Sequence, residues 1–225
     1  MSKADKWRAK WATEKCAIAL DLARGKCGGS YGEAVLILCT ALSAMAAEAW
    51  PGPGIDRKRM VQLLRRFAPD NLRSTLISVP ILVWALRKKR KRGSAARVRK
   101  AFLNYQPSLL VTGDNVDRTE RQIIQVAPRL KPRELREFSY ANILYRELRS
   151  PYVHEFRPGK RVTSWSMIGA EDAHVSYVNW VHDPDRHIHF HVDWLAELVK
   201  GTAIAMDEVG GKMPLRKPRR WWIGG

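Results

Sequence analysis

Cysteine is scarce in this chain, and its few residues have no spacing that suggests a shared role. Cys16, Cys27 and Cys39 make an odd count and contain no Cys-x-x-Cys pair. This pattern indicates neither a disulfide framework nor a structural zinc site. We therefore expect a protein of a reducing compartment, and the cytoplasm fits.

The sequence also shows no pattern typical of a leader, a membrane span or a phosphate-binding loop. Its first residues contain no apolar core of signal-peptide length, and the apolar run from Val79 to Leu86 is too short to cross a bilayer. The glycines are scattered rather than grouped around a phosphate. These absences predict a soluble intracellular protein with no membrane partner and no cofactor.

Acidic residues are few relative to basic ones. Against 22 Asp and Glu stand 40 Lys and Arg, which gives a net charge of +18. Solubility needs far less charge, so the excess indicates attraction to a polyanion, and nucleic acid is favoured over an anionic membrane. The hydrophobic content of 45% in 225 residues is enough to build a core.

Helical spacing of apolar side chains begins close to the N-terminus. Trp7, Trp11, Ile18 and Leu22 share one side of a basic amphipathic helix over residues 1–24, which the following glycines break. This helix reads as an appended arm. The predicted units are a basic arm (1–29), a helical domain (30–209) with a basic insertion around 87–117, and a basic tail with tryptophans (210–225).

Capping patterns predict the helices that open the main domain. Ser30 with Glu33 has the spacing of a capping box before a long helix, whose apolar content indicates burial on more than one side. Asp56 is predicted to cap a second helix. A further apolar segment, with Pro80 inside it, runs from Leu72 to Leu86.

The pattern changes toward the C-terminus. Residues 108–117 read as a loop, whereas 175–181 and 188–192 carry β-branched and aromatic residues in partial alternation around a turn at 182–186. A last helix is predicted from Asp193. The expected fold class is therefore mainly α, a helical bundle with a small β-hairpin before the last helix.

Residues 139–157 combine an amphipathic helix with a cluster of polar side chains. The apolar stripe of this helix consists of Phe138, Ala141, Tyr145, Leu148 and Tyr152. Pro151 removes a backbone donor and is expected to kink or end the helix near residues 148–150. Such a kink would turn Arg149 and His154 toward one groove.

Arg149 and His154 match the Arg-x4-6-His motif of the HEPN superfamily (higher eukaryotes and prokaryotes nucleotide-binding), which this chain resembles. A second match, Arg186 with His191, lies in a predicted strand, where odd spacing sends the two side chains to opposite faces. Residues 30–64 are also similar to the opening helices of certain bacterial HEPN proteins, which favours the first pair.

The resemblance implies a helical bundle that acts as a metal-independent endoribonuclease and leaves a cyclic phosphate. It further implies a homodimer with a composite site, in bacterial defence or a toxin-like system, with an antitoxin or another regulatory protein as partner. Ser150 stands where many active members have Asn, Asp or His. A catalytically silent HEPN module that binds RNA or a partner is therefore the alternative, and a structural nucleic-acid-binding protein is the second.

The chemistry of RNA cleavage suits the predicted pair. A 2′-hydroxyl must lose a proton as it attacks the phosphate, and a phosphorane with added negative charge results. Histidine titrates near neutrality and can take that proton, and a guanidinium can bind the phosphate oxygens in pairs. We assign these roles to His154 and Arg149, with Ser150, Tyr152 and Glu155 in support; Tyr152 also fits the core.

Three histidines alternate along the second predicted strand. His187, His189 and His191 would share one face, a spacing that a zinc or nickel ion could use. Because the pattern offers no acidic or fourth ligand nearby, we predict no metal site and expect exposed imidazoles that contact RNA.

Two basic stretches predict an RNA surface, the run from residue 87 to 100 and the tail, which we expect to be disordered in the free protein. Trp221 and Trp222 would stack on bases. The residues predicted to contact RNA are Arg87, Lys88, Lys89, Arg90, Lys91, Arg92, Arg97, Arg99, Lys100, Arg146, Arg157, Arg219 and Arg220.

Overall fold

The computed structural model describes residues 6–103, 111–165, 173–180, 183–209 and 213–224. Parts of several predicted segments fall outside these ranges: 1–5 of the N-terminal helix, 104–110 of the basic insertion and loop, 166–172 of the helical domain, 181–182 of the hairpin, and 210–212 and 225 of the tail. The described part is mainly helical, and a two-stranded antiparallel hairpin precedes the last helix. The predicted fold class is confirmed at this level.

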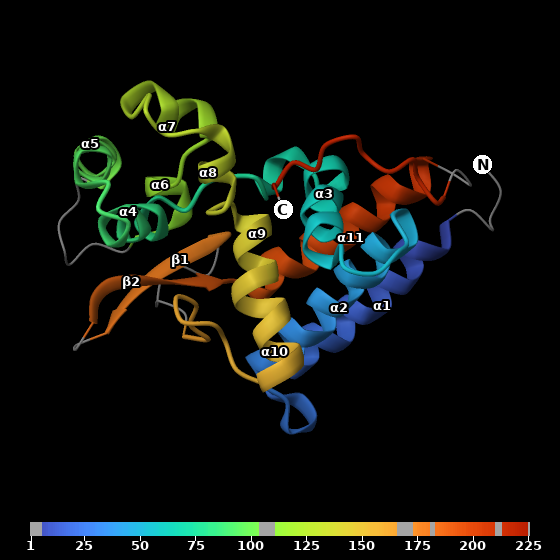
Figure 1. Cartoon of the computed structure of the whole chain (residues 1–225). Coiled ribbons are helices and arrows are strands. Elements are labelled where there is room, and N and C mark those ends of the chain that lie inside the picture. The colour runs from blue at the N-terminus through green and yellow to red at the C-terminus, as the bar shows by residue number, and fades with distance from the viewer. Residues whose placement is uncertain (1–5, 104–110, 166–172, 181–182, 210–212, 225) are drawn as a thin grey trace.

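Four long helices form the body on the right of Figure 1. They are α1 (Trp7–Ala23), α2 (Tyr31–Ala49), α3 (Asp56–Phe67) and α11 (Val192–Val209), with the short η2 (Lys26–Gly28) between the first two. α1 lies against α2 and α11 and buries small residues, Ala12, Cys16 and Ala19. Trp7 and Ile18 of the predicted stripe are 52% and 46% exposed. The N-terminal helix therefore packs within the body and does not project from it as an arm.

A buried ion cluster connects three of these helices. The Nε atom of Arg8 donates to Glu48 at 3.0 Å, and its Nη1 atom donates to Asp207 at 3.0 Å. The amide of Ala9 donates to the second Asp207 oxygen at 2.9 Å. Since Arg8 and Asp207 are 8% and 2% exposed, loss of Arg8 would leave the Asp207 carboxylate buried without its ion-pair partner.

The helix starts follow the sequence closely. Ser30 precedes α2, and its hydroxyl accepts a hydrogen bond from the Gly32 amide at 3.2 Å. Asp56, predicted as a cap, is instead the first residue of α3 after Ile55, and its carboxylate pairs with Arg59 one turn on. By length and apolar composition alone α2 could cross a membrane, a test that core helices also pass; here it packs against α1, α3 and α11.

The left half of Figure 1 contains shorter helices. They are α4 (Val79–Lys88), α5 (Arg92–Phe102), α6 (Gly113–Val116), α7 (Glu120–Val126) and α8 (Pro132–Arg136). The short η3 (Asp70–Leu72) that precedes them lies against α11. The predicted apolar segment from residue 72 becomes α-helical only at α4, which has Pro80 in its first turn, where a missing N–H is tolerated. The predicted loop at 108–117 contains α6, because the Asp117 amide donates to the Gly113 carbonyl at 2.7 Å.

The hairpin pairs β1 (Val175–Trp180) with β2 (Asp183–Phe190). Val175 lies opposite Phe190 and Tyr177 opposite Ile188, and all four side chains are buried. The predicted turn at 182–186 was too long, because β2 already pairs from its first residue with the end of β1.

A continuous helical segment runs between the two halves, yellow in Figure 1. It comprises α9 (Tyr140–Ile143), the π-helix η4 (Leu144–Arg149) and α10 (Ser150–Glu155). The predicted kink or end near residues 148–150 is wrong as an end, because the helix continues past Pro151 to Glu155. Pro151 cannot donate to the Glu147 carbonyl, and the Gly159 amide donates to that oxygen instead, at 2.7 Å.

The C-terminal segment folds back onto the body. The Leu215 amide donates to the Ala49 carbonyl at 2.8 Å, and the Trp50 indole donates to the Arg216 carbonyl at 3.3 Å. Ile223 is only 1% exposed. The expected disorder of the tail is therefore wrong for residues 213–224, because apolar side chains within the basic stretch anchor it.

Candidate functional site

Arg149 reaches from the π-helix toward α2. Its Nε atom donates to the Ser43 hydroxyl at 3.3 Å, and its guanidinium carbon lies 5.4 Å from the ring centre of Tyr145. The side chain is half-buried. The guanidinium therefore has fixed partners but retains donors for an anion, since it carries five N–H groups.

His154 lies on α10 and is exposed. Its ring makes no hydrogen bond or ion pair with any residue that the structure describes. Val153 beside it and Phe156, just past the helix end, are 43% and 58% exposed and form a small apolar surface next to the imidazole. Because five residues correspond to about 140° around a helix, Arg149 and His154 point to different sides, and one chain does not bring them together.

The predicted supporting residues have mostly structural contacts. Ser150 is the half-buried first residue of α10, and Tyr152 is 5% exposed, with its ring 6.4 Å from that of Phe156. The Glu155 carboxylate accepts a hydrogen bond from Arg157 Nε at 2.7 Å. The predicted RNA contact Arg146 likewise pairs with a neighbour, Glu147, at 2.7 Å.

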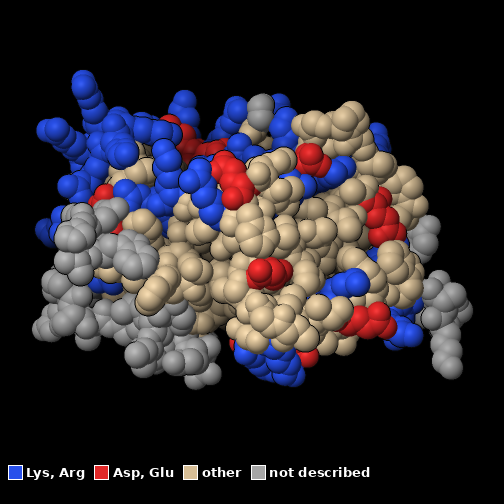
Figure 2. All heavy atoms as spheres, turned by 90° about the horizontal axis from the view of Figure 1, so that it is seen from below, with Lys and Arg blue, Asp and Glu red and all other residues tan. Residues whose placement is uncertain are grey.

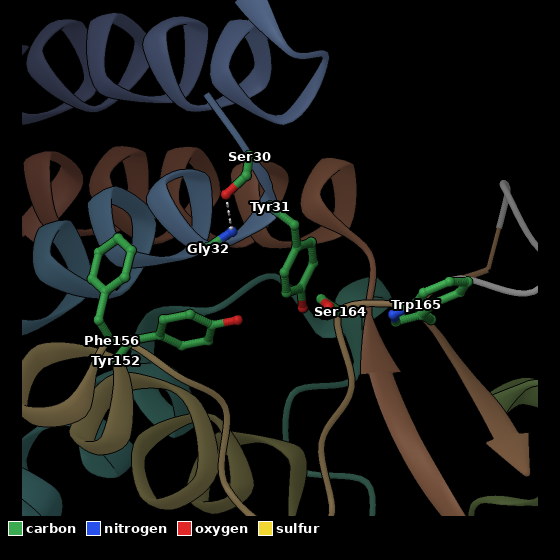
Figure 3. Close-up of a pocket in the computed structure, with 7 residues that line it drawn as sticks. All are labelled: Ser30, Tyr31, Gly32, Tyr152, Phe156, Ser164 and Trp165. Atoms are coloured by element: carbon green, nitrogen blue, oxygen red, sulfur yellow. Dashed lines mark hydrogen bonds between the residues drawn. The ribbon is translucent and has the colours of Figure 1, made fainter. Parts of the chain in front are cut away.

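A pocket of about 430 Å³ opens beside α10. Figure 3 shows Tyr152 from α10 pointing toward Tyr31 at the start of α2, with Phe156, just after α10, on one side and Ser164 and Trp165 on the strand-side rim. The Tyr31 hydroxyl donates to the Phe190 carbonyl at 2.9 Å, and burial raises the pKa of this phenol well above its usual value. The pocket offers aromatic faces and hydroxyl groups, which suit a planar polar ligand such as a base.

The hairpin histidines do not form the exposed face that their spacing predicts. His189 is 4% exposed and faces the Thr163 carbonyl at 3.1 Å, and burial lowers its pKa to about 4. His191 is 7% exposed and lies 3.2 Å from the Ser176 hydroxyl. Their expected role as exposed RNA contacts is therefore wrong. Within the described residues no group of three or more His, Cys, Asp or Glu side chains is placed to hold a metal ion.

The predicted basic run forms an exposed face on α4 and α5. Its exposed members are Arg87, Lys88, Lys89, Arg90, Arg92, Arg97, Arg99 and Lys100. Lys91 is half-buried and binds Glu134 on α8 at 2.6 Å. In Figure 2, lysine and arginine side chains crowd the left end of the molecule, where α4 and α5 lie in Figure 1. We call this surface the α4–α5 face.

Several residues of interest could not be recognised in the sequence. Trp84 on α4 lies between two cations, the Lys88 ammonium at 4.5 Å and the Arg161 guanidinium at 4.4 Å from its ring centre. Lys88 is one helical turn from Trp84, so this contact could have been predicted from the spacing. The contact with Arg161 could not, because the two residues are far apart in the sequence. A second group, on α3, α8 and the C-terminal segment, surrounds Trp222 and also joins remote residues.

No family model, curated protein or solved structure matches the chain.

Proposed function

We propose that the protein binds RNA through the α4–α5 face. The observation that carries this proposal is the concentration of exposed cations on two consecutive helices. Among the described residues of the run, only Lys91 forms an ion pair. Such a surface attracts phosphates and releases counterions, and it provides affinity without sequence preference. Trp84, also on α4, adds an aromatic ring whose centre lies 4.5 Å from the Lys88 ammonium.

Charge reversal tests this surface. We expect Arg97→Glu/Arg99→Glu to weaken binding of a single-stranded RNA at least tenfold in 100 mM salt, and to reduce the steepness of log K against log salt by about 1 to 2. The matched control is Lys10→Glu/Arg24→Glu, which changes the net charge equally on exposed positions of α1 and its C-terminal end. Equal losses in both variants would show a net-charge effect and contradict a defined face.

RNA cleavage is the second candidate function, within a HEPN-like protein of a defence or toxin-like system. The observation that favours it is His154, exposed without a partner among the described residues and flanked by exposed Val153 and Phe156. A second copy seated on these apolar side chains would supply its own Arg149 and His154 and complete a composite site. His154 would accept the 2′-hydroxyl proton and Arg149 would bind the phosphate, without a metal ion. An antitoxin or another regulatory protein could occupy the same surface.

Incubation of RNA with the purified protein in chelator tests cleavage. We expect products that end in a 2′,3′-cyclic phosphate, and a loss of at least 100-fold in rate for His154→Ala, since a general base contributes about 10²–10⁴-fold. Arg149→Ala should reduce the rate similarly, with circular dichroism as the check on folding because Arg149 also binds Ser43. RNA that stays intact with the wild type, or is cut equally by His154→Ala, would leave RNA binding alone.

A further inference from the structure

The C-terminal segment completes a second pocket, remote from α10. It follows α3 and ends beside α8 in Figure 1, and the concavity between these elements has a volume of about 410 Å³. Its lining includes four cationic side chains, from α3, α8 and the segment itself, and two indole rings. These residues are Lys58, Arg133, Arg136, Arg220, Trp221 and Trp222.

Trp222 is held firmly in this pocket. Its amide donates to the Gln62 side chain at 3.3 Å, and its carbonyl accepts from Arg136 Nη1 at 3.1 Å. The guanidinium carbons of Arg136 and Arg65 lie 5.4 Å and 5.9 Å from its ring centre. The following Ile223 is buried and anchors the backbone. Trp222 is therefore fixed in place, with two guanidiniums lying over its ring.

The charges in the pocket are not balanced. Arg136 binds the Glu120 carboxylate at 2.7 Å and 3.2 Å. Lys58, Arg133 and Arg220 have no ion-pair partner among the residues that the structure describes, and no acidic side chain lines the pocket. Three cations that line one pocket, with no ion-pair partner among the described residues, provide the donors that a phosphate requires, and the arginine forks can bind its oxygens in pairs.

The C-terminal segment passes close to Arg133. A Cβ atom added to Gly224 would lie 1.9 Å from the Nε atom and 2.2 Å from the Cζ atom of Arg133. The Arg133 guanidinium and the end of the segment therefore lie side by side in the pocket.

We propose that this pocket binds a phosphorylated nucleotide, with the phosphate on Lys58, Arg133 and Arg220 and the base beside the indoles of Trp221 and Trp222. The pocket has the size usual for small ligands, and aromatic side chains offer a base a surface to stack on. A free nucleotide and the 5′-phosphorylated end of an RNA present the same chemistry. The site is separate from the α4–α5 face. It would bind a single nucleotide, whereas the α4–α5 face would bind the phosphate backbone of an RNA.

Calorimetry with adenosine 5′-monophosphate, adenosine, and 5′-phosphorylated or 5′-hydroxyl hexaribonucleotides tests the proposal. For the wild type we expect binding of at least one phosphorylated probe, at least tenfold tighter than its unphosphorylated counterpart. Lys58→Gln/Arg133→Gln should lose that preference by tenfold or more. Arg121→Gln/Arg129→Gln, on exposed positions outside the pocket, should keep affinities within twofold of the wild type.

The arms of the experiment separate the ligand sources and the two proposals. Binding of the phosphorylated RNA alone assigns the pocket to an RNA end, and binding of the mononucleotide assigns it to a free nucleotide. Arg97→Glu/Arg99→Glu should retain the phosphate preference even where it loses backbone affinity. Absence of any phosphate preference in the wild type, or an unchanged preference in Lys58→Gln/Arg133→Gln, would overturn the proposal. Melting curves of each variant verify that it is folded.

Discussion

At the scale of single residues, Asp117 has the largest set of buried contacts that no local pattern reveals. One carboxylate oxygen accepts from the Val79 amide at 2.8 Å, at the start of α4, and the other accepts from Tyr177 of β1 at 2.5 Å and from Tyr140 of α9. The Tyr177 hydroxyl also lies 2.7 Å from that of Ser78. This one side chain therefore connects α4, α9 and the hairpin.

The stability of the fold should depend on pH through Asp117. Burial raises the pKa of this carboxyl to about 7. The hydrogen bonds from Tyr140 and Tyr177 favour the charged form and partly oppose this increase. An unfolded aspartate titrates near 3.9, so between about pH 4 and pH 7 the folded state holds a proton that the unfolded state has lost. The contribution of Asp117 to stability is present below pH 4 and falls by roughly 4 kcal/mol as the pH rises to 7.

Urea unfolding of the wild type and Asp117→Asn from pH 4.5 to pH 7.5 measures this contribution. His189 acts in the opposite direction, because its lowered pKa makes the folded state gain stability as the pH rises from about 4 to 6.5. The difference between wild type and variant cancels His189, and we expect the wild type to lose stability relative to the variant across this range. Parallel pH profiles would contradict the assignment.

At the scale of elements, the start of a helix was predictable where its capping signal is local. The continuation of the helix past Pro151 was not predictable. Ser30 marks α2 because its hydroxyl binds an amide two residues away. Pro151 correctly predicted a missing donor, but the Glu147 carbonyl finds the Gly159 amide after the chain has turned back. No local pattern predicts that contact, so the helix end was placed too early.

We expect Gly159→Ala to destabilise this segment. A Cβ atom at residue 159 would lie 2.9 Å from the Cα atom of Glu147, a backbone position that cannot rotate away, and 2.2 Å from its carboxylate. Overpacking of this kind costs about 1–3 kcal/mol. Thermal unfolding measures the loss, and Gly93→Ala, which meets nothing within 4 Å on α5, is the control. A Gly159→Ala protein as stable as the control variant would contradict the close approach.

At the scale of the whole molecule, the composition of the sequence predicted what kind of surface is exposed. It did not predict which segments pack against one another. The charge excess predicted an exposed basic surface, and the lysines and arginines from 87 to 100 do lie outside, because an apolar core cannot accept them. The tail was expected to be free, yet Ile223 and Trp221 pack on the body, with the Trp221 ring 5.9 Å from that of Trp50. The pocket beside α3 and α8 depends on this docking of the tail, which residue spacing alone does not specify.

Assembly is the remaining level, and the exposed apolar side chains of α10 lead to a prediction about it. We expect the protein to be a dimer, with a mass twice the 25.7 kDa of one chain, through a surface that includes Phe156 and Val153. Phe156→Asn should weaken the dimer at least tenfold, because two copies of the ring lose about 1.5–3 kcal/mol of apolar burial each. Asparagine is suitable here, since residue 156 has a left-handed backbone with φ 52° that asparagine tolerates.

Multi-angle light scattering over a concentration series measures the equilibrium between monomer and dimer. The control is Trp7→Ser, on a remote exposed position of α1. A wild-type monomer at tens of micromolar, or equal weakening by both variants, would remove the support for a composite Arg149–His154 site.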